Sequence, residues 1–266
     1  MGPVATMKGA HAMHLRAILA MIIAGASPAA YGQGQGLAVA GPVDPVHGFP
    51  QFYRDKAGRS LQPCLDIDAP GDPCGIADFR RIVFPATFPG RFVYWRATTR
   101  IRGLGGNISN RADLAIALEG AFAPPGGVAD GKQIVVARWR IRAPRGLLAL
   151  ATYTVTHPFG VKTVVADATG AIDVADEQGC TDAPPACDFK RVLTATDIGP
   201  FLTWDSARPS PPPGFIGDPD IEHTVTGSPL GTNVFRIDGP NAGGPNRNSI
   251  ETNLFTVTGK ISAGEH

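Results

Sequence analysis

The stretch Gln133-Ile134-Val135-Val136-Ala137-Arg138-Trp139-Arg140-Ile141-Arg142 decides the fold of this 266-residue chain. Toward its C-terminal end, apolar and polar side chains alternate one by one. Successive side chains of a β-strand point to opposite faces of a sheet, so a period of two predicts a strand with one buried face.

Similar runs recur along the chain and predict further strands. They are rich in aromatic and β-branched residues, are bounded by Gly, Pro, Asp or Asn, and cover residues 91–102, 147–155, 161–165, 224–226, 234–237 and 254–261. Segment 113–122 contains helix-forming residues, but Leu114, Ile116 and Leu118 are spaced by two, which favours a strand. We therefore predict an all-β protein, an antiparallel β-sandwich of immunoglobulin-like or jelly-roll-like type, with two packed β-modules as the alternative.

A proline-rich stretch divides the chain near its C-terminal end. Residues 208–214 read RPSPPPG, and consecutive prolines favour the extended polyproline II conformation. We predict a main sandwich over residues 33–207, a connection over 208–214, and C-terminal strands over 215–266. These last strands either complete the sandwich or form a small second β-module.

The N-terminal residues have the order of a secretory signal peptide. Lys8 and Arg16 precede an apolar run at residues 17–24, and small residues follow up to Gly32. The run is about half the ~20 residues that span a bilayer, so we expect no stable membrane insertion. We predict a signal peptide over residues 1–32, cleavage near Gly32, and a secreted or periplasmic protein.

The charge balance argues against nucleic acid as a partner. Residues 1–32 hold two of the 24 Lys and Arg residues and none of the 23 Asp and Glu residues, which leaves 22 basic and 23 acidic residues. Proteins that bind nucleic acid usually carry a clear basic excess, because they neutralise phosphates.

The four cysteines form two pairs that are local in sequence. Four cysteines allow three connectivities; the simplest joins Cys64 to Cys74 and Cys180 to Cys187, as suits an oxidising compartment. Zinc is the alternative, but neither pair has the C-x-x-C spacing or an adjacent histidine.

No catalytic signature stands out. The segment Gly227-Ser228-Pro229-Leu230-Gly231 differs from the G-x-S-x-G nucleophile motif, and the proline after Ser228 lacks the N–H of an oxyanion hole. Gly103–Gly106 lacks the spacing of a dinucleotide-binding loop and predicts a hairpin turn. We predict no catalytic residue from motifs.

Acidic clusters are the best metal candidates. Asp218, Asp220, Glu222 and His223 lie within six residues, and in an extended chain the three carboxylates share one face that suits Ca²⁺. Asp66, Asp68 and Asp72 form a second cluster. The alternative is that both clusters are solvated loops in which Asp caps turns. Apart from Ca²⁺, we predict no cofactor.

Two other patterns suggest ligand binding. Two predicted strands each carry three arginines on one face: Arg96, Arg100 and Arg102 on the first, and Arg138, Arg140 and Arg142 on the second. If these strands are neighbours, their guanidinium groups line one sheet face, which suits an anionic ligand. The alternative is an exposed sheet face on which acids separate the arginines. Trp204 beside the proline-rich stretch is a candidate sugar-stacking platform, or else a core residue.

A sequence segment with the pattern of a strand, a turn and a second strand occurs twice. Thr154–Val164 is similar to Thr224–Val234, with one inserted residue. Pro and Gly between β-branched residues predict a hairpin at each copy, and chance similarity is the alternative.

The segments Ala151–Gly160, Ile198–Trp204 and Gly214–Ile237 resemble an uncharacterised family of secreted bacterial proteins, some of which carry appended immunoglobulin-like surface modules. The resemblance implies an exported β-rich domain and carries no activity over. This chain ends after its last predicted strand, so we expect no anchoring by such modules.

Three functions follow as hypotheses. The first is a secreted, non-catalytic β-sandwich protein that binds an extracellular or envelope ligand such as a glycan, through the arginines or Trp204. The second is a secreted glycan or ester hydrolase that uses the cluster from Asp218 to His223. The third is a structural envelope or matrix protein.

Overall fold

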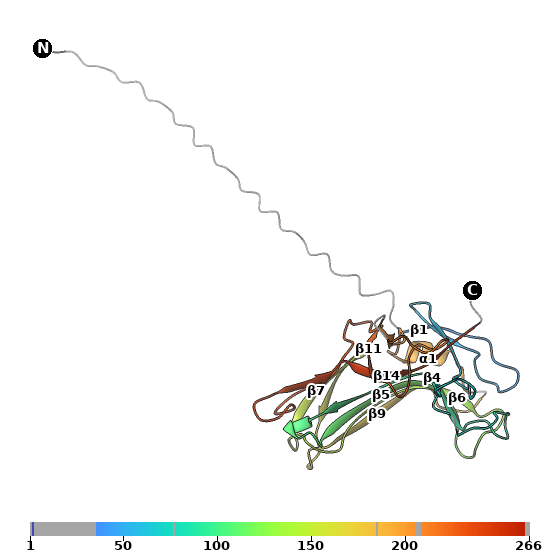
Figure 1. The fold of residues 1–266 in the computed structure, drawn as a ribbon, viewed down its shortest axis with the longest axis horizontal. Coiled ribbons are helices and arrows are strands. Elements are labelled where there is room, and N and C mark those ends of the chain that lie inside the picture. Colours follow the sequence, from blue (N-terminus) through green and yellow to red (C-terminus); the bar gives the residue numbers. More distant parts are fainter. Residues whose placement is uncertain (1, 3–35, 77, 185, 206–208, 264–266) are drawn as a thin grey trace. The chain divides into compact units, whose positions relative to one another are not determined.

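Three antiparallel sheets make up the β-structure of the computed structural model, which describes Gly2 and residues 36–76, 78–184, 186–205 and 209–263. The predicted signal peptide and its cleavage point thus lie outside the described residues, apart from Gly2. The described residues from Gly36 onward belong to one compact unit. The prediction of an all-β sandwich is confirmed (Figure 1).

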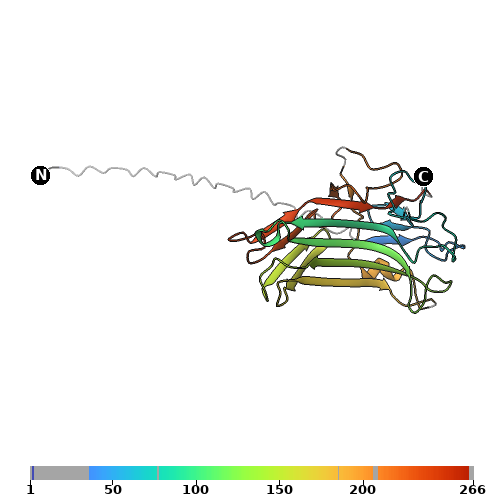
Figure 2. The same cartoon turned by 60° about the horizontal axis from the view of Figure 1, so that its bottom comes forward.

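The largest sheet has seven strands, and its long central strands lie side by side from red through green to gold in Figure 2. In spatial order they are β10 (Thr203–Trp204), β11 (His223–Thr226), β14 (Leu254–Thr258), β4 (Arg91–Arg102), β5 (Arg111–Phe122), β6 (Gln133–Ala143) and β9 (Ile172–Cys180). The ambiguous segment 113–122 is confirmed as a strand, β5, and the predicted turn at Gly103–Gly106 joins β4 to β5 through the short 3₁₀ helix η1 (Leu104–Gly106).

Two four-stranded sheets complete the β-structure. One has the order β13 (Ser249–Thr252), β12 (Phe235–Asp238), β7 (Thr152–His157) and β8 (Gly160–Val165). The other has the order β1 (Leu37–Ala40), β2 (Tyr53–Asp55), β3 (Ser60–Gln62) and β15 (Lys260–Ile261). A single α-helix of five residues, α1 (Arg191–Ala195), lies among the described residues, and none of their helices has the length and apolarity to cross a membrane.

Strands that follow the proline-rich stretch pair with strands that precede it. β14 pairs with β4, β12 pairs with β7, and β15 pairs with β3. The last two strands are separated by Gly259, where a Cβ atom would approach Ile216 to 2.9 Å. The position therefore favours glycine, and the predicted strand 254–261 is divided there between two sheets.

The core lies between the facing sheets and is built from every second side chain of the long strands, with a change of parity at a bulge in β4. Trp95, Tyr153 and Phe235 are fully buried there, from β4, β7 and β12. Burial of large aromatic side chains contributes about 1.5–3 kcal/mol each to folding. Trp95 is thus a core residue, as its strand pattern indicates.

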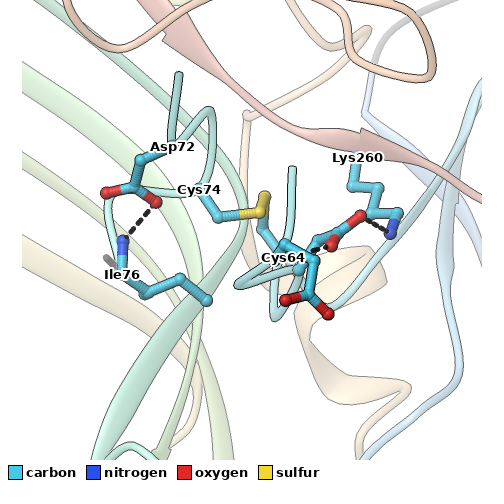
Figure 3. The surroundings of a disulfide bond; sticks show 7 residues. Cys64, Asp72, Cys74, Ile76 and Lys260 are labelled. Atoms are coloured by element: carbon cyan, nitrogen blue, oxygen red, sulfur yellow. Dashed lines mark hydrogen bonds and ion pairs between the residues drawn. A yellow bond between two sulfur atoms is a disulfide. The ribbon is translucent and has the colours of Figure 1, made fainter. Parts of the chain in front are cut away.

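Both predicted disulfides are present, Cys64–Cys74 and Cys180–Cys187, and the described chain has no free cysteine. The first, shown in Figure 3, closes a loop. This loop packs its own small apolar cluster against Val93 and Phe215. In this loop Asp72 accepts a hydrogen bond from the backbone N–H of Ile76 at 2.8 Å. Asp66 bonds to Lys260 on β15, and this hydrogen bond lowers the pKa of the carboxyl group. The carboxylates of this second acidic cluster therefore stabilise turns and pair with a lysine.

Two sequence predictions of local structure are wrong, and six of the described strands were not predicted: β1, β2, β3, β9, β10 and β13. The strand expected over 147–155 begins only at Thr152, because Leu148 to Ala151 form a turn in which Leu150 has a φ of 60°. The second copy of the repeated segment is not a hairpin, since β11 and β12 belong to different sheets. The edge strand β9 was not predicted, because Asp173, Asp176 and Glu177 interrupt the alternation of apolar and polar residues in its sequence.

Candidate functional site

The predicted arginine face exists, but most of its arginines are paired with acids: Arg96, Arg100, Arg138, Arg140 and Arg142. β5 lies between β4 and β6, so that Asp113 stands in register between Arg100 and Arg142. Arg100 Nε lies 2.5 Å from Asp113 Oδ1, and Arg140 Nη2 lies 2.7 Å from Asp173 Oδ2 on β9. This arrangement matches the alternative of an exposed face on which acids separate the arginines.

A buried carboxylate joins three more arginines on the same face. The side chain of Glu119 is only 6% exposed, and its oxygens lie 2.5 Å from Arg91, 3.5 Å from Arg96 and 4.0 Å from Arg138. A bulge between Val93 and Trp95 shifts the strand parity, and this brings Arg91 onto the face that Arg96 occupies. Glu119 thus holds three strands together through charge.

The acidic cluster at Asp218–His223 does not converge. Asp218 Oδ1 accepts the backbone N–H of Asp220 at 2.8 Å, which is a turn interaction. Glu222 lines a surface groove of about 370 Å³ with Arg100 and Asp113, whereas His223 is buried. Within the described part of the chain, no group of three His, Cys, Asp or Glu side chains could hold a metal ion.

Two residues singled out from the sequence, Trp204 and His223, meet in the interior. Their rings stack with centroids 4.8 Å apart and planes inclined by 16°. His223 Nδ1 lies 2.7 Å from the carbonyl oxygen of Thr224. Trp204 is 5% exposed, so its indole is a core side chain and offers no open surface for a sugar.

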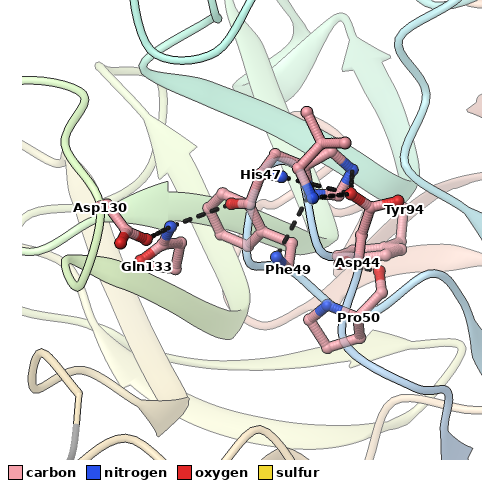
Figure 4. A network of polar contacts seen from close by, with 8 residues as sticks. Asp44, His47, Phe49, Pro50, Tyr94, Asp130 and Gln133 are labelled. Atoms are coloured by element: carbon pink, nitrogen blue, oxygen red, sulfur yellow. Dashed lines mark hydrogen bonds and ion pairs between the residues drawn. The ribbon is translucent and has the colours of Figure 1, made fainter.

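A second partly buried histidine, His47, lies in a network of polar contacts that includes a nearby carboxylate (Figure 4). His47 Nδ1 accepts the backbone N–H of Phe49 at 3.2 Å, while Asp44 Oδ1 accepts the N–H of His47 at 3.2 Å and lies 3.7 Å from its Nε2. Gln133 donates to the His47 carbonyl oxygen at 2.9 Å. Burial lowers the pKa of His47, although the Asp44 charge opposes this. This network positions the aromatic residues around Phe49.

His157 has no such complement of partners. It ends β7, is 3% exposed, and accepts the backbone N–H of Phe159 at Nδ1 over 3.3 Å. Its Nε2 is buried and has no hydrogen-bond partner among the described residues. Burial and the nearby Lys162 charge lower the pKa of His157 to about 4. The imidazole is therefore neutral at pH 7.

The surroundings of His157 form a small chamber at the open edge of the sandwich, where β8 and β9 are the edge strands. The chamber has a volume of about 20 Å³. Trp139 stacks on His157 with centroids 6.3 Å apart, and Lys162 Nζ lies 5.0 Å from the Trp139 ring centroid. Gln178, Thr196 and Asp197 complete the polar lining.

A larger recess adjoins this chamber, since Phe159, Thr196 and Asp197 line both. The recess has a volume of about 380 Å³. Its further walls come from α1, from the turn after β11 and from the first strands, through Lys56, Leu193, Thr194, Pro229 and Leu230. We call the chamber and the recess together the edge cleft.

The sequence did not single out the residues of the edge cleft as a site. One signal was present: His157 shares the parity of buried Tyr153 and Val155, and Lys162 shares that of buried Val164. Polar residues at buried strand positions are uncommon without a partner or a function. The chain was compared with protein-family models, curated proteins and solved structures, and it matches none of them.

Proposed function

We propose that this chain is an exported, non-catalytic β-sandwich protein that binds an extracellular glycan in the edge cleft. The observation that carries the proposal is the buried Nε2 of His157, which has no hydrogen-bond partner in the described structure and belongs to a residue that lines a chamber beside Trp139. An unsatisfied buried donor costs about 1–3 kcal/mol, and a ligand oxygen would remove this cost.

The composition of the cleft supports a sugar ligand. Ligand pockets combine apolar walls with a few polar groups that fix orientation. Here Leu193, Pro229 and Leu230 supply apolar surface, while Thr194 and Asp197 supply groups that bond to hydroxyls. The recess of about 380 Å³ lies within the usual range of about 300–1,000 Å³.

Export is part of the same proposal. All four cysteines form disulfides, which persist in oxidising compartments. The signal-peptide pattern of residues 1–32 supplies the route. An extracellular or periplasmic position would expose the cleft to surface polysaccharides.

A glycan array with the purified protein tests the function. Thr194→Trp should fill the recess and weaken binding about tenfold or more, since a blocked pocket loses its contacts. Thr163→Trp is the matched control, because Thr163 is exposed on β8 and does not line the cleft. Absence of binding to any glycan contradicts the function, and equal binding by both variants contradicts the site.

A further inference from the structure

We propose that the inner chamber of the edge cleft accepts a carboxylate oxygen, so that the glycan ligand carries a hexuronic acid. This inference rests on the proposed function and names its ligand class. The geometry that supports it is a buried histidine N–H without an acceptor and a lysine ammonium group without an ion pair among the described residues, both from residues that line a chamber of about 20 Å³.

The tautomer of His157 makes its free nitrogen a donor. Nδ1 accepts the N–H of Phe159, so in the neutral ring the proton resides on Nε2. That N–H is buried and has no acceptor among the described residues. The group that satisfies it must bring a lone pair and cannot be a donor alone.

Lys162 adds a positive charge to the same chamber. Its ammonium group is half-buried over the Trp139 ring, and it forms no ion pair or hydrogen bond to another described residue. A carboxylate accepts hydrogen bonds at both oxygens and has no proton to donate. Charge-assisted bonds from an ammonium group to a carboxylate are roughly twice as strong as neutral ones.

The volumes of the chamber and the recess indicate which part of the ligand each can hold. About 20 Å³ corresponds to roughly one water-sized probe, which is room for one oxygen and too little for a sugar ring. The ring and its hydroxyls would occupy the recess of about 380 Å³ beside Thr194 and Asp197. A uronic acid has the required carboxylate on a hydroxylated ring.

The charge of the cleft agrees with an anionic group. Lys56 and Lys162 carry two positive charges, and Asp197, which is exposed at the shared rim, is the one acid among the lining residues. A bound carboxylate would balance the remaining charge. Asp197 stays available to accept ring hydroxyls.

Isothermal titration calorimetry of the purified protein at pH 7 tests the inference, with glucuronate and galacturonate as ligands and glucose and galactose as neutral analogues. We expect the uronates to bind at least about tenfold more tightly than the neutral sugars. Lys162→Met and His157→Phe should each abolish this preference. Lys132→Met is the control, because Lys132 lies in the loop before β6 and does not line the cleft.

Each outcome decides between the two proposals. Equal affinity for uronates and neutral sugars, unchanged in Lys162→Met, overturns the carboxylate inference and leaves glycan binding intact. Failure of free and array-bound sugars of every class to bind overturns both. If His157→Phe does not fold, Lys162→Met still decides, since its half-buried side chain lies on an edge strand.

Discussion

The hydroxyl group of Ser228 donates a hydrogen bond to the carbonyl oxygen of Pro158 at 2.6 Å. Ser228 Oγ in turn accepts the backbone N–H groups of Leu230 and Thr232 at 3.2 and 3.0 Å. Two turns that lie seventy residues apart in sequence are thereby joined. Phe159 and Leu230, which flank this contact, both line the recess, so the bond positions two walls of the edge cleft.

Removal of this hydroxyl should destabilise the protein. We expect Ser228→Ala to lower the free energy of unfolding by about 1–3 kcal/mol, because one carbonyl and two N–H groups lose their partner. Urea unfolding monitored by tryptophan fluorescence measures the change. Ser249→Ala on the exposed edge strand β13 is the control, and an equal loss in both variants would contradict this role of Ser228.

Stability should depend on the protonation of His157. Its pKa is about 4 in the folded protein, below the usual 6.5. The unfolded chain therefore binds the proton first as the pH falls. The stabilisation is complete above pH 6.5 and is lost between pH 6.5 and about 4, by at most about 3 kcal/mol. The charged side chains that line the same chamber are Lys162 and Asp197.

Urea unfolding at a series of pH values checks this, together with NMR titration of the His157 ring. His157→Phe should flatten the profile in this window, whereas the matched substitution His47→Phe should leave most of it. A His157 ring that titrates near pH 6.5 in the folded protein would refute the prediction.

The charge of Glu119 should be essential for stability. Glu119→Gln removes the charge that three partly exposed arginines share, and we expect a loss of about 1.5–3 kcal/mol, because the hydrogen bond from Arg91 then goes to a neutral amide and the other two pairs lose their attraction. Chemical denaturation measures it. Asp173→Asn is the control on the same face, and its effect should be small because Asp173 is 48% exposed. Comparable losses would show that burial does not set the strength of these pairs.

The Cys64–Cys74 disulfide should stabilise its loop. The cysteines are ten residues apart, and closing a loop of this length contributes about 2–3 kcal/mol by restricting the unfolded chain. We expect the Cys64→Ala, Cys74→Ala double variant to have a lower melting temperature in calorimetry. Reducing agent should lower the melting temperature of the unsubstituted protein and leave that of a variant without all four cysteines unchanged.

The sequence was sufficient for local features. Alternation over residues 91–102 and 133–142 placed the central strands, because side chains of one parity must be buried together. Local spacing also paired the cysteines correctly. Strands without clear alternation escaped prediction, of which acidic β9 is the main example.

The candidate site required the tertiary structure. His157, Trp139 and Asp197 come from β7, β6 and the segment after α1, and no local pattern relates them. The same holds for the arginines of β6. Their acidic partners lie on the neighbouring strands β5 and β9, and the sequence does not show which strands are neighbours. The sequence alone determined the long central strands, since these follow from period and composition. Only the tertiary structure decided which strands are neighbours, because pairing between distant segments depends on the packing of the whole core.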